Sequence, residues 1–241
     1  APEVRLVTAR VAAASADNSA ARSARSRTGP RTFTPPSAMA EAMGIVPWAM
    51  AAAVSGSITS VTVVAGSKRP RDPQITIHAE NYRDTYALKR RARTWTKHPL
   101  IEAGFRLFRL PAGLHLDVTI FSAAPAGAST GTSASVSVAL LGALDLLGRR
   151  SLTSYELAAK AHYIESALLK LQSGIQDQLC AAYGGINFIE MSRYPEASVS
   201  PVVLPEELTW ELESRLLLIY LGRPHSSSAV HETVIRRLEE S

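Results

Sequence analysis

Several short stretches of the chain have the residue pattern of β-strands. Residues 57–64, "SITSVTVV", are rich in β-branched side chains, and residues 73–82, "PQITIHAENY", alternate between apolar and polar positions. Residues 114–122, "LHLDVTIFS", predict another strand, and "INFIEM", residues 186–191, predicts one directly after a Tyr-Gly-Gly turn. Together these segments predict a sheet within a mixed α and β fold.

Three other stretches repeat their apolar residues at helical spacing. Residues 98–110, "HPLIEAGFRLFRL", place four apolar side chains near one helical face: Leu100, Ile101, Phe105 and Phe108. A second helix is expected from Thr132 or Ser133, either of which can cap it, to Gly148, which can end it. Its packing positions are Val136, Leu140, Ala143, Leu144 and Leu147. A third helix is expected over about 154–170, because Thr153 and Glu156 form a capping box.

Composition indicates a globular chain that can bury a core. Of the 241 residues 46% are hydrophobic, and the single cysteine, Cys180, excludes an intramolecular disulfide framework. We expect a reducing, cytoplasmic location. The uncharged stretch from Gly44 to Ser67 has the length of a membrane span, but Pro47, Gly56 and many small or hydroxylated residues fit a hydrocarbon core poorly. We therefore expect no membrane partner.

Positive charge is concentrated in one part of the chain. Residues 46–110 contain eleven Lys or Arg against four acidic residues, whereas residues 111–241 contain nine against fourteen. The cluster "LKRRARTWTK", Leu88–Lys97, places Trp95 among cations, which suits phosphates or nucleic acid. A solvated connection or helix face explains the same cluster, and we favour it because there is only one such run. Nucleic-acid binding is kept as an alternative.

The stretch "APAGASTGTSASVSVALLGAL", residues 124–144, joins a predicted strand to a predicted helix through a loop of small and hydroxylated residues. Backbone amides at a helix N-terminus, with the flexibility of Gly127 and Gly131, suit an anion such as phosphate. A Walker loop requires a lysine before the hydroxyl residue, and no lysine lies from Pro111 to Ser154. Ordinary turn chemistry is the alternative explanation.

Two carboxylates downstream of this loop are candidates for chemistry. Glu165 has apolar neighbours on the third expected helix, although an acid there can also lie on the wet edge of a helix. Asp177 lies between Gln176 and Gln178 in "SGIQDQLCAAYGG", residues 173–185. It can act as a general base for a hydroxyl nucleophile, or it can cap the helix that follows.

The loop and the Asp177 segment together resemble a known family. Residues 125–144 are similar to the second motif of the GHMP kinases, P-x-G-x-G-L-G-S-S-A, a family that includes galactokinase, homoserine kinase and mevalonate kinase. Residues 173–191 are similar to the segment bearing the catalytic aspartate in the sugar-kinase branch, most of all the D-glycero-D-manno-heptose 7-phosphate kinase type. The resemblance runs from about Pro35 onward and is strongest over residues 98–191.

This resemblance implies a set of site residues. The ATP phosphates would be wrapped by Pro125, Gly127, Ala128, Ser129, Thr130, Gly131, Thr132, Ser133 and Ala134. Ser133 and Glu165 would hold Mg²⁺, and Asp177 would be the catalytic residue near the acceptor hydroxyl. We expect the substrate to be bound beside it by Gln176, Gln178, Tyr183 and Gly184. Phosphoryl transfer requires positioning and charge neutralisation, which a backbone cradle, one divalent ion and one carboxylate supply.

The sequence also departs from the family pattern. Ser129 and Thr130 replace the usual Gly-Leu, and Thr132 replaces the first of two serines. The family's first motif, G-G-G-T-D-x-P-P, appears as "GPRTFTPP" at residues 29–36, with Phe33 where an aspartate is expected, and its third, glycine-rich motif has no counterpart. A His225 and His231 pair could suggest a metal, but turn and helix-cap chemistry explains "PHSSSAVH" better.

We predict an α+β chain in three parts. Residues 1–45 are expected to be an atypical, poorly ordered leader. Residues 46–195 are expected to be a GHMP-kinase-like N-terminal, ATP-binding domain, and residues 196–241 the start of a truncated α/β sandwich domain. The predicted function is ATP- and Mg²⁺-dependent phosphorylation of a hydroxyl on a sugar or sugar phosphate. The alternatives are a degenerate homologue that binds nucleotide or a partner without turnover, and a nucleic-acid-binding module.

Overall fold

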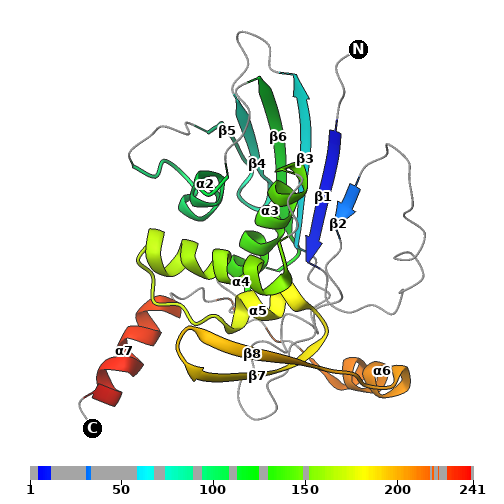
Figure 1. The fold of residues 1–241 in the computed structure, drawn as a ribbon, viewed down its shortest axis with the longest axis vertical. Coiled ribbons are helices and arrows are strands. Elements are labelled where there is room, and N and C mark those ends of the chain that lie inside the picture. The colour runs from blue at the N-terminus through cyan, green and yellow to red at the C-terminus, as the bar shows by residue number, and fades with distance from the viewer. Residues whose placement is uncertain are drawn as a thin grey trace.

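The fold is known from a computed structural model and is built around a six-stranded sheet (Figure 1). The residues described are 5–11, 31–33, 59–67, 74–88, 94–108, 113–124, 130–148, 152–217, 219, 222 and 227–239. The strands are β1 (Arg5–Val11), β2 (Arg31–Phe33), β3 (Thr59–Ser67), β4 (Ile75–Ala79), β5 (Asp84–Ala87) and β6 (Leu114–Ser122), in the spatial order β2-β1-β3-β6-β4-β5. A single-turn helix, η2 (Glu80–Tyr82), links β4 to β5.

The sheet is mixed, with both parallel and antiparallel neighbours. β3 pairs antiparallel with β1 on one side and with β6 on the other, where Thr59 lies opposite Ser122. β4 runs parallel to β6 and antiparallel to β5, and β2 runs parallel to β1. Every second residue of β3 and β4 is buried, which is the alternation of a sheet with one covered face. The pairing places the end of β6 beside the start of β3.

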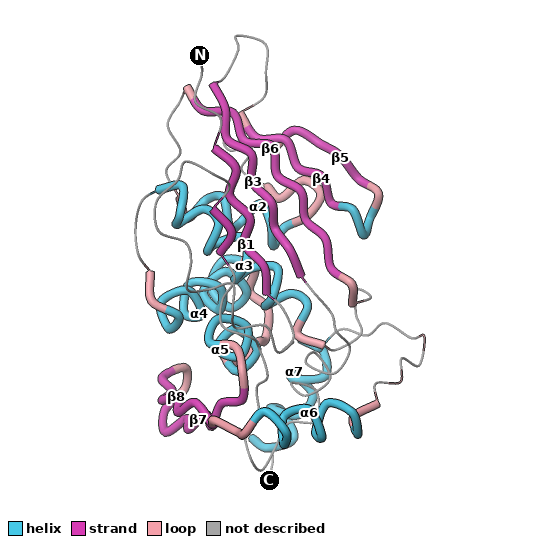
Figure 2. The backbone as a smooth tube through the Cα atoms, turned by 90° about the vertical axis from the view of Figure 1, so that its right-hand side faces the viewer, coloured by secondary structure: helices cyan, strands magenta, loops and turns pink. Residues whose placement is uncertain are grey.

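A group of helices packs beside the sheet (Figure 2). They are α2 (Pro99–Arg106), α3 (Thr132–Gly148), α4 (Ser154–Tyr163) and α5 (Gln176–Tyr183), with the π-helical turn η3 (Ile164–Leu168) continuing α4. α3 packs against β1 and β3 on one side and against α4 and α5 on the other. It is therefore the central helix of the domain, and it is buried for most of its length.

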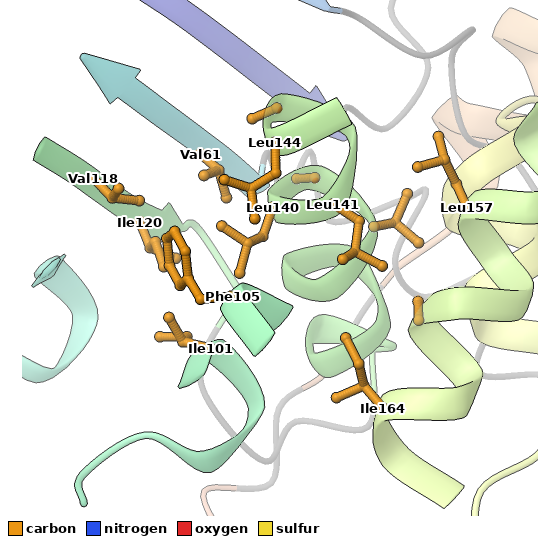
Figure 3. Close-up of a cluster of buried hydrophobic side chains, with 14 of the residues drawn as sticks. Val61, Ile101, Phe105, Val118, Ile120, Leu140, Leu141, Leu144, Leu157 and Ile164 are labelled. Atoms are coloured by element: carbon orange, nitrogen blue, oxygen red, sulfur yellow. The ribbon is translucent and has the colours of Figure 1, made fainter. Parts of the chain in front are cut away.

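The hydrophobic core fills the space between α3 and its neighbours (Figure 3). Leu140 and Leu144 of α3 lie with Val61 of β3 and Phe105 of α2, and all four are almost fully buried. The same cluster extends across α3 to Leu157 and Ile164 of the α4 segment, among other apolar residues. Large aliphatic side chains packed at this density make α3 a rigid element, so its N-terminus is held in a fixed place.

A second, smaller layer follows α5 and forms the partial second domain. The strands β7 (Ile186–Arg193) and β8 (Glu196–Val202) pair antiparallel as a two-stranded sheet, with an irregular register between Glu190 and Arg193. Two helices complete it, α6 (Glu206–Arg215) and α7 (Ser227–Glu239). The expected mixed α and β fold, with part of a second domain, is confirmed.

Most predicted elements are confirmed, with changes at their ends. The strands expected at 57–64, 73–82, 114–122 and 186–191 are β3, β4, β6 and β7. The capping box is present: Thr153 Oγ1 accepts from the Glu156 amide, and Glu156 Oε2 accepts from the Thr153 amide at 2.8 Å. The helix expected over 154–170 changes to π-helical geometry at Ile164 and ends at Leu168.

Two other expectations differ from the structure. α3 begins at Thr132, so Gly131, rather than Thr132 or Ser133, precedes the helix; the Thr132 hydroxyl instead lies 3.0 Å from that of Thr130. β1 and β2 fall within residues 1–45, where we expected a poorly ordered leader. Their partners are distant in sequence, and that pairing is not visible in a local pattern. The division of the chain at residues 45 and 195 stays a prediction.

The described part of the basic cluster is engaged within the protein. The Arg106 guanidinium stacks over the Trp95 ring at 3.7 Å, and Trp95 packs against the hydrophobic core. Lys97 Nζ lies 2.6 Å from Asp84 Oδ1. Residues 89–93 of the cluster lie outside the described residues. None of the helices in the described ranges is long and apolar enough to cross a membrane.

Candidate active site

The N-terminus of α3 forms one side of the candidate site. β6 leads into the glycine-containing loop, of which Pro125, Gly127, Ala128 and Ser129 lie outside the described residues. Gly131 has a φ of +64°, a left-handed conformation that side chains rarely adopt. The Ser135 amide donates to the Gly131 carbonyl at 2.9 Å, the first hydrogen bond of the helix. The amides of Thr132, Ser133 and Ala134 therefore precede the helical hydrogen-bond ladder and suit an anion.

The strand that feeds this loop is clamped by a residue that sequence analysis did not single out. Asn81, in η2, donates from Nδ2 to the Ser122 carbonyl at 2.6 Å and accepts from the Ser122 amide on Oδ1 at 2.7 Å. Ser122 is the last residue of β6. Because both backbone groups of Ser122 are held by one side chain, the loop starts from a fixed position. Asn81 lies within residues 73–82, which the sequence predicted as a strand, and no signal there set it apart from the other polar positions.

Asp177 forms the other side of the site. It lies in the first turn of α5, and α5 packs against α3. A β-carbon placed on Gly131 would lie 3.5 Å from Asp177 Oδ2, so the backbone of the loop and this carboxyl are in near contact. The structure thus brings Gly131 and Asp177 together, although α3, α4 and η3 lie between them in the sequence. Asp177 does not cap α5 through its side chain, because Ile175 is the N-cap residue and no side-chain cap is present.

The surroundings of Asp177 change its acidity. Burial raises the pKa of the carboxyl to about 7 from its ordinary value of 3.8, and the nearby negative charge of Glu165 raises it further in the same direction. Both effects disfavour the ionised form, the first by removing water and the second by repulsion. A carboxyl with a pKa near neutrality can accept or release a proton under physiological conditions, which is the property required of a general base.

Glu165 lies in the π-helical turn and is only 5% exposed. Its Oε2 accepts two hydrogen bonds, from Ser173 Oγ at 2.6 Å and from Gln178 Nε2 at 3.0 Å. Its Oε1 has no hydrogen-bond partner among the described residues. A buried carboxylate oxygen without a donor is costly unless something positive occupies the space in front of it. Sequence analysis left open whether Glu165 lay on a wet helix edge, and the structure places it inside.

The residues present fit a divalent cation held by few protein ligands. Glu165 Oε1 supplies one free carboxylate oxygen, and Ser133, also expected to bind the ion, is exposed at the N-terminus of α3. Within the described ranges no three His, Cys, Asp or Glu residues group into a closed metal site. Mg²⁺ keeps several waters and is usually bound through one or two carboxylates together with substrate phosphates. Glu165 Oε1 is thus a candidate ligand for such an ion, and the part of Ser133 stays a prediction.

The four residues expected to bind substrate lie on α5 and its ends. Gln176 is partly buried, and its side chain folds over Gly174 so closely that a β-carbon there would meet Oε1. Gln178 is 1% exposed, and its amide nitrogen is occupied by Glu165. Tyr183 is partly buried, and Gly184 caps α5 through its amide to Cys180 and accepts from Asn187 at 2.7 Å. Their roles toward a substrate stay predictions. His225 lies outside the described residues, as does the His231 side chain.

Comparisons with known proteins show that part of the chain is similar to one family. Residues 99–185 match the family model of the GHMP kinases N terminal domain. The chain is 29% identical over 119 residues to a D-glycero-alpha-D-manno-heptose 7-phosphate kinase from Campylobacter jejuni, a match that covers 49% of this chain and 35% of that protein. It is 30% identical over 125 residues to a mevalonate kinase from Pyrococcus horikoshii, covering 52% of this chain and 33% of that protein.

A solved structure agrees with these matches. The D-glycero-D-manno-heptose 1-phosphate kinase from Bacteriodes thetaiotaomicron shares the fold with a TM-score of 0.54 and 27% identity, over 66% of this chain and 55% of that chain. The chain spans about a third of the length of the curated relatives that it matches. The matched region includes α3, Glu165 and Asp177. Residues 99–185 of this chain are therefore similar to the N-terminal domain of the GHMP kinases.

Proposed function

We propose that this protein transfers the γ-phosphoryl group of ATP to a hydroxyl of a sugar or sugar phosphate, with a heptose 7-phosphate as the model substrate. The observation that carries the proposal is the near contact between Gly131 and Asp177 Oδ2. It sets an anion-binding helix N-terminus beside a carboxyl able to take a proton. The sugar-phosphate class is supported by two of the similar proteins, which are heptose phosphate kinases, whereas a third is a mevalonate kinase.

The α3 N-terminus would bind the phosphates of the nucleotide. The amides of Thr132, Ser133 and Ala134 point out of the helix end, where the helix dipole adds partial positive charge. Glycine at position 131 lets the backbone adopt its left-handed turn and leaves no side chain between the loop and Asp177. Because α3 is packed into the core, these donors are fixed before the nucleotide arrives, and transition-state charge is stabilised without reorganisation.

Asp177 would act on the acceptor hydroxyl. In the reaction the hydroxyl oxygen forms a bond to the γ-phosphorus, the bond from that phosphorus to the β–γ bridging oxygen breaks, and ADP leaves. The hydroxyl proton passes to Asp177, whose pKa near 7 lets it accept the proton at neutral pH. Glu165 would hold Mg²⁺, which when bound supplies positive charge to the phosphates. Glu165 would also orient the ion through Oε1, since Oε2 is already occupied.

The test is ATP turnover over a panel of sugars and sugar phosphates, heptose 7-phosphates included, in the wild type and in Asp177→Asn. We expect ADP formation that depends on one acceptor class and falls by at least a hundredfold in the variant, because Asn cannot take the proton. Asp145→Asn is the matched control, because Asp145 is a buried carboxyl that lies in α3, ~20 Å along that helix from Gly131 and away from the site. Turnover unaffected by Asp177→Asn contradicts the mechanism, and nucleotide binding without turnover indicates the degenerate homologue instead.

A further inference from the structure

We propose that Tyr194, in the turn between β7 and β8, is a positioning residue for Glu165, and that it acts through Ser173. The proposal rests on the proposed function, because Glu165 matters in this way only if it holds a cation. Tyr194 belongs to the second layer of the structure, and neither its position in the sequence nor its type pointed to the site. Part of the β7–β8 turn would therefore help to orient Glu165 in the candidate site.

Ser173 is the link between the turn and the carboxylate. Its hydroxyl donates to Glu165 Oε2 at 2.6 Å. Its carbonyl accepts from the Tyr194 hydroxyl at 3.0 Å and lies 3.1 Å from His162 Nε2. The same residue thus touches the site with its side chain and the β7–β8 turn with its backbone.

His162 and Tyr194 support each other. His162 Nε2 lies 2.8 Å from the Tyr194 hydroxyl, and the two rings meet edge to face with their centroids 5.5 Å apart. With a proton on Nε2, His162 donates to the Tyr194 oxygen while the Tyr194 hydroxyl donates to the Ser173 carbonyl. His162 is 6% exposed, whereas Tyr194 is 57% exposed. The turn therefore reaches over the surface and fixes Ser173 from outside.

The segment that carries Ser173 is irregular, and the Ser173 hydroxyl has two further contacts, with Gln178 Nε2 at 3.4 Å and with the Gly174 carbonyl at 3.1 Å. Residues 169–174 form neither helix nor strand between η3 and α5. Leu171 N donates to the Glu165 carbonyl, and Gln172 N donates to Ser228 of α7. Ser173 itself is held through the carbonyl that His162 and Tyr194 share. Tyr194 is the donor to this carbonyl in that arrangement, so loss of its hydroxyl would leave only His162 Nε2, 3.1 Å away, to replace it and would let the Ser173 hydroxyl move away from Glu165.

That movement matters because it decides which oxygen of Glu165 is free. The terminal torsion of a glutamate side chain is soft, so a carboxylate turns easily unless its oxygens are held. Ser173 and Gln178 both donate to Oε2, which leaves Oε1 as the carboxylate oxygen without a hydrogen-bond partner among the described residues. When one of these two donors is displaced, the Glu165 carboxylate rotates more freely, so that Oε1 and Oε2 can change places. The cation then loses a ligand that was oriented before it bound.

The experiment measures Mn²⁺ binding by electron paramagnetic resonance, in the presence of the non-hydrolysable analogue AMP-PNP, for five proteins. They are the wild type, Tyr194→Phe, Ser173→Ala, the double variant and Tyr163→Phe. Tyr163 is the matched control, because it is half-exposed at the end of α4 and its hydroxyl has no hydrogen-bond partner among the described residues. Metal-free AMP-PNP affinity and the melting temperature are recorded for each protein, so that a general loss of structure is detected.

We expect Tyr194→Phe to raise the Kd of Mn²⁺ about three- to tenfold, the size of one net hydrogen bond, with metal-free AMP-PNP affinity unchanged. Tyr163→Phe should match the wild type. Since Tyr194 acts through Ser173, the double variant should bind Mn²⁺ no more weakly than Ser173→Ala alone. Unchanged Mn²⁺ affinity in Tyr194→Phe, or effects that add in the double variant, would overturn the inference. Wild type that fails to bind Mn²⁺ overturns both this inference and the cation site, whereas Mn²⁺ binding without turnover contradicts only the proposed function.

Discussion

Replacing Asp177 by Asn should make the free energy of unfolding less dependent on pH. The carboxyl has a pKa of about 7 in the folded protein, against an ordinary value of 3.8, because it is buried and because Glu165 lies close to it. The folded state therefore keeps a proton that the unfolded chain releases. This contribution to stability is complete below about pH 4 and is lost as the pH rises through about 7. The Asn variant carries no such proton and lacks the effect.

The size of the effect follows from the two pKa values. Each pH unit over which only the folded state holds the proton is worth ~1.4 kcal/mol. From pH 5.5 up to the folded-state pKa there are roughly one and a half such units, so the wild type should lose ~2 kcal/mol between pH 5.5 and pH 8.5 from this one group. Other titrating groups, such as the histidines, are common to both proteins and cancel in the difference.

The assay is urea unfolding of the wild type and Asp177→Asn at pH 5.5 and pH 8.5, with a chelator present to keep cations off Glu165. We expect the wild type to lose ~2 kcal/mol more than Asp177→Asn over this interval. The stability of Asp177→Asn relative to the wild type should therefore be higher at pH 8.5 than at pH 5.5. Parallel pH dependence of the wild type and Asp177→Asn would refute the raised pKa and, with it, the case for Asp177 as a base at neutral pH.

Two further substitutions test the parts that surround the site. Gly131→Ala places a side chain on a residue with a φ of +64° and a methyl group 3.5 Å from Asp177 Oδ2. We expect ~1–2 kcal/mol of backbone strain and about tenfold weaker binding of AMP-PNP, measured by calorimetry. Wild-type affinity for AMP-PNP would show that the nucleotide does not use this turn. Thr153→Ala removes the capping box of α4 and should lower the free energy of urea unfolding by ~1 kcal/mol with AMP-PNP affinity unchanged; no loss of stability would show that the box observed at Thr153 and Glu156 contributes nothing.

Local signals in the sequence predicted the elements that local physics determines. The Thr153 and Glu156 capping box is a contact between neighbours in the chain, and it appears as expected. The strand at Leu114–Ser122 is found with the expected bounds, because alternation along one strand depends only on which face is covered. β1 was missed because its stability comes from pairing with β3, whose partner residues lie 48 to 60 positions away in the sequence.

The sequence predicted the residue types of the site, but it did not predict how far these residues are buried. Asp177 and Glu165 were identified from their resemblance to the family motifs. Glu165 lies in the π-helical turn and is buried, but no residue pattern predicted that turn, so the sequence left its burial open. The roles of Asn81 and Ser173 arise from contacts between segments far apart or without regular structure. Such contacts follow from the tertiary packing of whole elements, and single-sequence reasoning does not reach them.

The most direct measurement for the central claim is a crystal structure of the protein with AMP-PNP and Mg²⁺. The account predicts that the triphosphate lies at the N-terminus of α3, with its oxygens within hydrogen-bond distance of the amides of Thr132 to Ala134. It also predicts that Glu165 faces the ion through Oε1 and that Asp177 lies on the side where an acceptor hydroxyl would approach the γ-phosphate. A nucleotide bound elsewhere, or phosphates at α3 with Asp177 turned away from them, would contradict it.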